Sequence, residues 1–182
     1  GRNKDFISNI KFIINSNDKV HLLDIDPGYD TNRTVVTFVG HPDQVIQTAF
    51  KLIEYASINI DMTQHTGEHP RMGATDVCPL VPISGVTMSE CVEFSKVLAK
   101  KVSLNLDIPV FLYENSANSS ERISLSNIRS GEYEGMENKI TSENFLPDYG
   151  LNFNSKSGAT AIGAREFLIA YNINLNTTDK KI

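Results

Sequence analysis

The densest group of chemically capable side chains lies between His65 and Leu80, in the string HTGEHPRMGATDVCPL. It contains His65 and His69, two of the four histidines in the chain. An imidazole titrates near neutral pH, so it can act as a general base and then as a general acid. Two imidazoles with a neighbouring glutamate can also bind zinc. The string therefore predicts either a catalytic loop or a metal site.

The metal interpretation depends on the local backbone. The string begins H-T-G-E-H, a pattern that binds zinc when a helix places both imidazoles on one face. Gly67 weakens a helix from within, and Pro70 disfavours helical backbone at His69. We therefore expect a loop without metal, in which His69 is an acid–base histidine held between Glu68 and Arg71. The open alternative is a polar connector in which Glu68 and Arg71 are solvated charges only.

The other histidines and the cysteine of this string have plainer interpretations. We expect His65 at a helix end or in support of His69. His21 and His41 open predicted elements and are expected to be structural. Cys78 lies on an apolar stretch, which favours a buried, inert thiol over a nucleophile.

Hydrophobic periodicity predicts the elements that position this loop. Apolar residues at helical spacing indicate helices over residues 5–16, 41–61 and 87–107, the last opening on the capping-box pair Thr87 and Glu90. Apolar and β-branched runs between turn residues indicate strands over residues 20–26, 33–40, 76–84, 109–114 and 167–175. Residues 115–157 are polar and rich in turn residues, with one short helix.

The order of these elements favours one fold class. The strands over residues 20–26 and 33–40 follow one another across the turn PGYDTN, so we expect them to pair antiparallel. A strictly alternating β/α chain would not pair consecutive strands, which argues against a doubly wound sheet. Pro79 and Pro82 make the 76–84 strand an edge strand or a broken one. We predict an α+β sandwich with helices packed on a mixed sheet.

Composition sets the broad class of protein. The 182 residues are 40% hydrophobic and 21% charged, which is enough apolar material for one packed domain. The net charge of −5, with no long basic run, argues against nucleic acid as the main partner. The spacing of Cys78 and Cys91 suggests no disulfide framework or metal knuckle, which is typical of a reducing, cytoplasmic compartment. No apolar run of about 20 residues is present, so no membrane span is expected.

Several long strings resemble one enzyme family. In order along the chain they are LLDIDPGYDTNRTVVTFVG, NIDMTQHTGEHPRMGATDVCPLVPI, IPVFLYE, IRSGEYEGM, LPDYG and SGATAIGAREFLIAYNINL. They resemble the glutamate formimidoyltransferases, including the N-terminal part of the formimidoyltransferase-cyclodeaminases. The resemblance covers almost the whole chain. It implies two ferredoxin-like α+β halves with substrates bound between them, and this chain resembles the first half.

The resemblance also implies how the chain is divided. The sequence starts GRNKDF, without a methionine, and ends NTTDKKI, as a piece of a longer protein would. The family's opening strand and F-S-E-G turn would precede GRN, and the second half would follow the last residues. We therefore expect residues 1–182 to be an N-terminal subdomain without its first strand, with the C-terminal subdomain absent from this chain.

The reaction implied by the resemblance is a one-carbon group transfer in histidine degradation. The formimidoyl group moves from N-formimidoyl-L-glutamate to N5 of tetrahydrofolate, a co-substrate, and no metal takes part. The family's catalytic histidine, in G-E-H-P-R-M-G, matches His69. The acid that closes L-L-D-x-D matches Asp26, which would orient or stabilise the imidazolium. The alternative for Asp26 is a turn-initiating aspartate before Pro27.

Substrate-binding residues follow from the same resemblance. Both implied substrates are anionic and arginine binds carboxylates bidentately, so we expect Arg33 and Arg71 to bind them, with Glu68 also at the substrate site. The alternative for the two arginines is that they are solvated surface residues. The loop that the family uses against folate matches Gly150, Leu151, Asn152, Phe153, Asn154, Ser155, Lys156, Ser157 and Gly158. Such enzymes are commonly homodimers. The alternative function is a non-catalytic, stand-alone N-terminal subdomain that binds folate or a partner.

Overall fold

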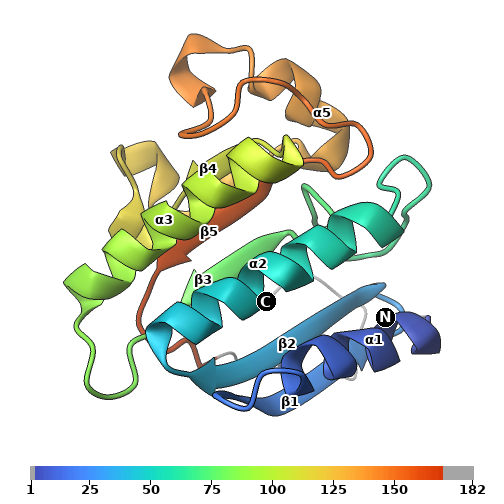
Figure 1. The fold of residues 1–182 in the computed structure, drawn as a ribbon. Coiled ribbons are helices and arrows are strands. Elements are labelled where there is room, and N and C mark those ends of the chain that lie inside the picture. The colour runs from blue at the N-terminus through green and yellow to red at the C-terminus, as the bar shows by residue number, and fades with distance from the viewer. Residues whose placement is uncertain (1–2, 170–182) are drawn as a thin grey trace, which may run out of the picture.

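A computed structural model describes residues 3–169 of the chain (Figure 1). The helices of this part are α1 (Lys4–Asn15), α2 (Pro42–Asn59), α3 (Met88–Leu106), α4 (Leu125–Arg129) and α5 (Glu132–Lys139). The strands are β1 (Val20–Gly28), β2 (Arg33–Gly40), β3 (Val77–Leu80), β4 (Val110–Leu112) and β5 (Thr160–Ala164). The short 3-10 helices are η1 (Glu114–Ser116), η2 (Ser120–Arg122) and η3 (Glu143–Phe145).

The long helices begin where the local sequence provides a cap. The Asn3 side chain accepts a hydrogen bond from the Phe6 backbone N–H at the start of α1. Pro42 is the first residue of α2, a position whose N–H has no acceptor within the helix, so proline loses no hydrogen bond there. Thr87 and Glu90 form the predicted capping box at the start of α3. The boundaries predicted for these helices are therefore confirmed to within two residues at each end.

The strands form two separate sheets. β1 and β2 pair antiparallel, from Val20 opposite Gly40 to Gly28 opposite Arg33. β3, β5 and β4 form a parallel sheet in the order β3-β5-β4, so β3 is an edge strand, as Pro79 predicts. The predicted α+β class is confirmed, with the antiparallel and parallel pairings in separate sheets.

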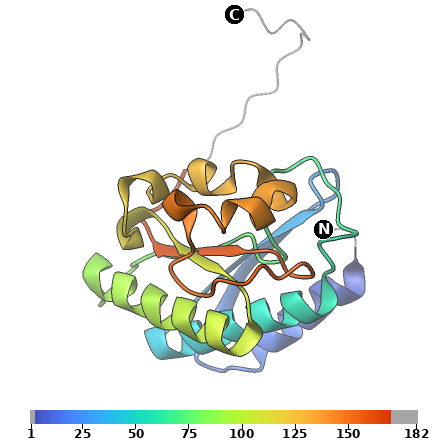
Figure 2. The same ribbon diagram turned by 90° about the horizontal axis from the view of Figure 1, so that it is seen from above.

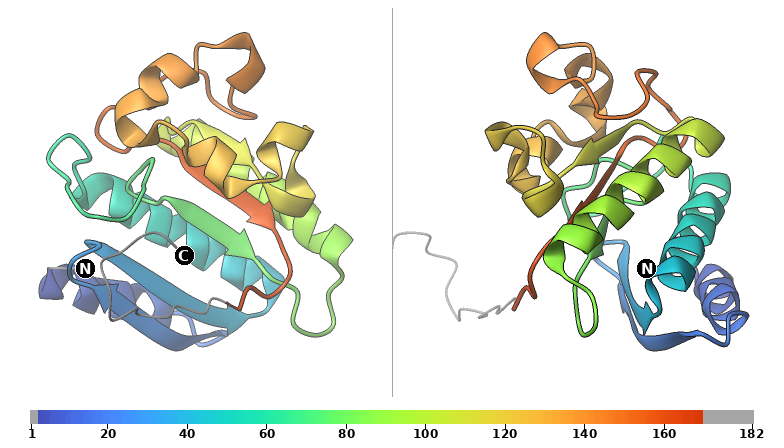
Figure 3. Two further views of the ribbon diagram at one scale, coloured as in Figure 1. Left: turned by 180° about the vertical axis from the view of Figure 1, so that it is seen from behind. Right: turned by 60° about the vertical axis from the view of Figure 1, so that its left-hand side comes forward.

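The long helices cover one side of both sheets. Figures 1 and 3 show α1, α2 and α3 lying side by side across the strands. One buried cluster joins α2 and α3 to the sheet and includes Ile53, Leu98, Val102, Leu112 and Ile162. Figure 2 shows α4 and α5 on the side of β4 and β5 that faces away from α3, and a second buried cluster joins these two helices to the strands. No helix within residues 3–169 is long and apolar enough to cross a membrane.

The last strand differs from the prediction. Residues 167–169 of the predicted 167–175 strand have no regular secondary structure, and residues 170–175 lie outside the described residues. The strand is β5, whose sequence TAIGA carries little of the β-branched signal that marks a strand. All of its residues are buried, and a Cβ on Gly163 would lie 2.2 Å from the Tyr113 carbonyl oxygen. Close packing therefore requires a small residue at Gly163, and the sequence of β5 lacks the pattern that predicts a strand. The 115–157 region also holds two short helices, where one was expected.

Candidate active site

The loop between α2 and β3 is built against the turn of the β1–β2 hairpin. The Asn32 side chain donates from Nδ2 to the Thr66 carbonyl oxygen at 2.9 Å. A Cβ on Gly67 would lie 2.4 Å from the Thr31 carbonyl oxygen, so only glycine permits this approach. The loop consequently has no helical turn over residues 65–69, as Gly67 and Pro70 predict. The helical geometry that the zinc pattern requires does not form.

His69 is half-buried in this loop, and both of its ring nitrogens have partners. Nδ1 lies 2.5 Å from the Pro70 carbonyl oxygen, and Nε2 lies 2.6 Å from Nη1 of Arg33. A carbonyl oxygen only accepts hydrogen bonds, and a guanidinium only donates them. The partners therefore assign a neutral imidazole with its proton on Nδ1 and its lone pair on Nε2. This form of His69 is a base whose accepting nitrogen faces Arg33.

Asp26 lies on the same face of the hairpin as Arg33. It is opposite Val35 in the β1–β2 register, and Arg33 is two positions further along β2. Side chains at such diagonal positions are neighbours on one face of a sheet. The exposed Asp26 side chain makes no hydrogen bond or ion pair with any residue between 3 and 169. The partner of Nδ1 of His69 is the Pro70 carbonyl oxygen, where a supporting carboxylate would otherwise bind. The orienting role of Asp26 stays a prediction.

Arg71 is occupied by acidic side chains of α5. Its Nη1 lies 3.0 Å from Glu132, and its Nη2 lies 2.7 Å from Glu134 and 3.2 Å from the His65 carbonyl oxygen. The hydrogen bond with Glu134 is the main cause of the raised pKa of Arg71. Arg71 therefore ties the His69 loop to α5. Its predicted role in substrate binding stays a prediction, with these donors already in use.

A cavity of about 290 Å³ lies between His69 and the turn that precedes α5. Its lining consists of His69, Pro70, Ser126, Arg129, Ser130, Gly131 and Glu132. Arg129 forms an ion pair with Asp76, at the end of the His69 loop. We did not single out these lining residues beyond His69 from the sequence. The available signal was the string IRSGEYEGM, in which Gly131 adopts a φ of 85° and turns the chain back toward His69.

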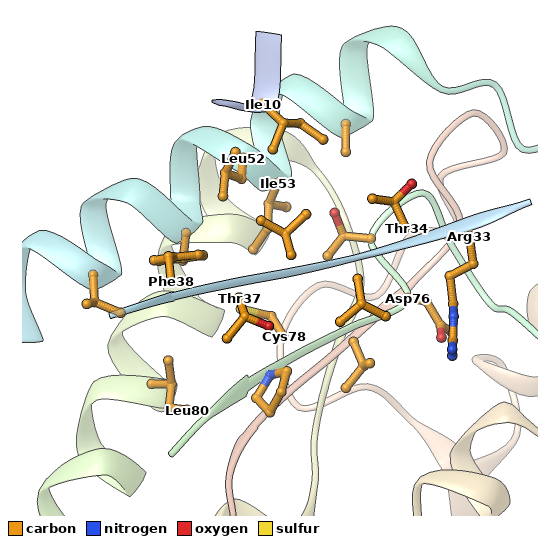
Figure 4. A pocket seen from close by; sticks show the side chains of 18 of the residues that line it. Ile10, Arg33, Thr34, Thr37, Phe38, Leu52, Ile53, Asp76, Cys78 and Leu80 are labelled. Carbon is orange, nitrogen blue, oxygen red and sulfur yellow. The ribbon is translucent and has the colours of Figure 1, made fainter. Parts of the chain in front are cut away.

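A larger cavity of about 970 Å³ lies between β2 and β3, over α1 and α2 (Figure 4). Arg33 and Thr37 point to one side of β2 in Figure 4, whereas Thr34 and Phe38 point to the helices on the other. Residues 33–40 of β2 and 77–80 of β3 all line the cavity. Since successive side chains alternate between faces, the strands must present their edges to it. His69 and Arg71 line it as well.

The predicted folate loop, residues 150–158, packs beside the same segment of chain. The Met62 and Ala74 backbone N–H groups donate to the Lys156 and Ser157 carbonyl oxygens, each at 2.8 Å. Tyr133 of α5 donates from its hydroxyl to the Ser155 carbonyl oxygen at 2.6 Å. The loop is therefore held against both the His69 loop and α5. None of its residues lines either of the two cavities that His69 lines.

Gly73 and Gly158 make the closest contact between these two segments. They form an isolated antiparallel bridge. A Cβ on Gly73 would lie 2.1 Å from the Ala159 carbonyl oxygen, and one on Gly158 would lie 2.2 Å from that of Met72. Gly158 also has a φ of 69°, which favours glycine. This pair of glycines brings the two loops predicted to form the site into direct contact.

The remaining candidates have structural surroundings. His65 donates from Nε2 to the Asn32 carbonyl oxygen at 3.0 Å, so it also holds the loop to the hairpin. The exposed His41 precedes α2, and its side chain makes no capping bond. Burial raises the pKa of the half-buried Cys78 to about 12, which keeps its thiol protonated and unreactive. Within the described residues, no three histidine, cysteine or acidic side chains are grouped to hold a metal.

Fold and site together define an α+β domain that presents one oriented, neutral imidazole beside an arginine, an arrangement suited to proton transfer. Residues 1–165 match the family model of the formiminotransferase domain, N-terminal subdomain, and the chain belongs to that family. Over 182 residues it is 48% identical to a formimidoyltransferase-cyclodeaminase of Dictyostelium discoideum, covering 100% of this chain and 34% of that protein. Over 178 residues it is 48% identical to a glutamate formimidoyltransferase of Streptococcus pyogenes serotype M1, covering 97% of this chain and 60% of that protein.

The relatives also include an archaeal protein. The chain is 42% identical over 184 aligned residues to a glutamate formimidoyltransferase of Thermoplasma acidophilum, covering 100% of this chain and 61% of that protein. The chain thus spans between a third and three fifths of the length of these relatives.

Proposed function

We propose that this chain is the N-terminal subdomain of a glutamate formimidoyltransferase. The whole enzyme would move the formimidoyl group from N-formimidoyl-L-glutamate to N5 of tetrahydrofolate, in histidine degradation. The observation that carries the proposal is His69, whose Nδ1 is held by the Pro70 carbonyl while Nε2 carries the lone pair. The family match and the names of the relatives support the type of group transferred.

The proposed chemistry needs one base that becomes an acid. N5 of tetrahydrofolate attacks the amidine carbon of the substrate and becomes cationic. His69 accepts the N5 proton at Nε2, while Nδ1–H stays bonded to the Pro70 carbonyl oxygen. The imidazolium then gives the proton to the glutamate nitrogen as the bond from that nitrogen to carbon breaks. A carbonyl fixed on Nδ1 favours this cycle, because it stabilises the imidazolium without itself titrating.

The surrounding charges suit two anionic substrates. Asp26 and Arg33 lie on one face of the hairpin, so Asp26 would orient or stabilise the His69 imidazolium while Arg33 binds a carboxylate. Glu68 is exposed next to His69 and would contact the incoming amidine. The loop over residues 150–158, packed beside residues 62–74, would provide backbone groups for the pterin.

The test is a transfer assay on the whole protein that carries this sequence, with His69→Ala. Loss of a general acid–base group is expected to lower kcat by about 10²- to 10⁴-fold. His41→Ala is the matched control, since His41 is exposed and makes no capping bond. Wild-type turnover in His69→Ala would show that the acid–base role is wrong.

The second candidate is a binding module without transferase activity. It is suggested by the family match, which covers one subdomain only. Titrating tetrahydrofolate into the 182-residue chain, followed by the transfer assay on the same sample, separates the two. Binding without turnover in both this chain and the whole protein would support the module.

We further propose that a strand preceding Gly1 in the whole protein joins the two sheets, and that a second subdomain completes the site. The cavity bounded by the edges of β2 and β3 supports the first part, and Asn3 at the start of α1 lines that cavity. Adding the natural preceding residues is expected to raise Tm, because an edge pair gains a partner. An unchanged Tm would count against it. A ferredoxin-like topology, a homodimer and a cytoplasmic location belong to the same proposal.

A further inference from the structure

The lone pair that makes His69 a base is covered in the structure. Nη1 of Arg33 donates to Nε2 at 2.6 Å, and Nδ1 is already committed to the Pro70 carbonyl oxygen. An imidazole nitrogen that accepts one hydrogen bond has no second lone pair in the ring plane. In this arrangement His69 cannot receive a proton until Arg33 leaves Nε2.

Arg33 differs from the other arginines around His69. Arg71 is bound by Glu132 and Glu134, and Arg129 is paired with Asp76. Both of these guanidinium groups are largely buried, with side-chain exposures of 14% and 17%. Arg33 is exposed, and in residues 3–169 no carboxylate lies within ion-pair distance of it.

These partners decide which cation can respond to an anionic ligand. Drawing Arg71 or Arg129 toward a ligand would break an existing, partly buried ion pair. Moving Arg33 breaks only a hydrogen bond to a neutral imidazole at an exposed position. A hydrogen bond between arginine and carboxylate has charge on both sides and two parallel contacts, so it is stronger than the bond it would replace. A carboxylate next to His69 therefore competes successfully for Arg33.

We propose that Arg33 is a substrate-operated cap on the catalytic base. A carboxylate of a glutamate-type substrate draws the guanidinium away from Nε2, and the same event exposes the lone pair that accepts the N5 proton. The cap rests on the proposed function, and it adds a specificity rule to it. A ligand that lacks the carboxylate leaves His69 covered, so the base is available only when the anionic substrate is bound. Arg33 is thus a positioning and specificity residue acting through His69.

The test observes the His69 ring nitrogens directly, in the 182-residue chain labelled with ¹⁵N. At about pH 8.5, roughly two units above the ordinary histidine pKa, long-range ¹H–¹⁵N spectra distinguish a protonated nitrogen from an unprotonated one. We expect His69 to show protonated Nδ1 and an Nε2 shifted by an accepted hydrogen bond. Arg33→Ala should move Nε2 toward the position of an uncapped, unprotonated nitrogen. Titrating sodium L-glutamate into the wild type should move it in the same direction.

The controls separate the cap from general effects. Sodium chloride at equal ionic strength should leave Nε2 in place, and so should glutamate added to Arg33→Ala. Arg33→Lys keeps a cationic donor and should restore part of the capped shift. His65 should show the opposite tautomer because it donates from Nε2 to the Asn32 carbonyl oxygen, so its signal reports that each variant is folded. His21 and His41 are exposed, and their signals should not move.

Three results would overturn the cap: a wild-type Nε2 already at the uncapped position, no response to glutamate in either the 182-residue chain or the whole protein, or an equal response to chloride. None of these measurements requires turnover. If the transfer assay fails while the spectra behave as expected, the proposed function is wrong, and only the displacement of Arg33 from Nε2 by a carboxylate remains. If the spectra fail while His69→Ala abolishes transfer, the cap alone is wrong.

Discussion

The bridge between Gly73 and Gly158 gives the sharpest test of how the His69 loop and the loop over residues 150–158 are held together. Four glycines cover the combinations of two properties, a positive φ and a close backbone neighbour. Gly73 has the neighbour alone, and Gly158 has both. Gly85 has a φ of 70° with nothing within 4 Å of its Cβ position, and Gly135 in α5 has neither property. Alanine at each position therefore isolates each physical cause.

The size of each effect follows from those properties. Alanine at Gly73 must displace the Ala159 carbonyl oxygen, 2.1 Å from its Cβ, and overpacking of this kind costs about 1–3 kcal/mol. Alanine at Gly85 costs about 1–2 kcal/mol for the left-handed backbone. Alanine at Gly158 suffers both, so about 2–5 kcal/mol is expected. Alanine at Gly135 should stabilise α5 by about 0.5–1 kcal/mol.

The assay is thermal unfolding of the wild type and the four variants, followed by circular dichroism in one buffer. For a chain of this size, 1 kcal/mol corresponds to about 2–4 °C in Tm. Gly158→Ala is then expected to lower Tm by about 4–20 °C, Gly73→Ala and Gly85→Ala by smaller amounts, and Gly135→Ala is expected to raise Tm slightly. A Gly73→Ala variant as stable as the wild type would refute the close approach. A Gly158→Ala variant no worse than Gly85→Ala would refute the summation.

Three further predictions follow from individual contacts. The hydrogen bond from Arg71 lowers the pKa of Glu134 below its ordinary value of 4.5. The ionised Glu134 therefore stabilises the fold above pH 4.5, and this stabilisation is lost as the pH falls through the lowered pKa. The urea midpoint of unfolding should drop less on acidification in Glu134→Gln than in the wild type. Cys78, with a pKa raised to about 12, should resist iodoacetamide near pH 8 until urea unfolds the chain, as peptide mapping would show. Tyr133→Phe removes the hydroxyl bonded to the Ser155 carbonyl and should weaken tetrahydrofolate binding several-fold by calorimetry, with little change in Tm; equal affinity would exclude that contact.

Local patterns in the sequence determined the long elements. The helical spacing of apolar residues, and the caps at Asn3 and Thr87, act within a few residues of one another, so they can be read without knowing the rest of the fold. The β1–β2 hairpin follows from two β-branched runs around a turn. Pro79 correctly predicts an edge strand, because proline cannot donate to a ladder. The resemblance of whole strings led to the family and to His69.

Long-range packing decided the last strand and the surroundings of Arg71. In β5, Gly163 lies against the Tyr113 carbonyl oxygen, a contact that leaves no space for a side chain, and no periodicity within TAIGA reveals it. The residue type of Arg71 predicts carboxylate binding. Its partners, Glu132 and Glu134, lie about 60 positions away in the sequence. Their occupation of the guanidinium is visible only in three dimensions.

For His69, too, the sequence determined some properties and the tertiary structure determined others. The sequence by itself determined that His69 stands in a rigid, non-helical loop, because Gly67 and Pro70 act on the backbone beside it. Only the tertiary structure decided which nitrogen is basic, because that depends on the Pro70 carbonyl folding back on Nδ1 and on Arg33 arriving from another strand. A residue's chemistry is local, whereas its protonation and partners depend on how distant segments pack.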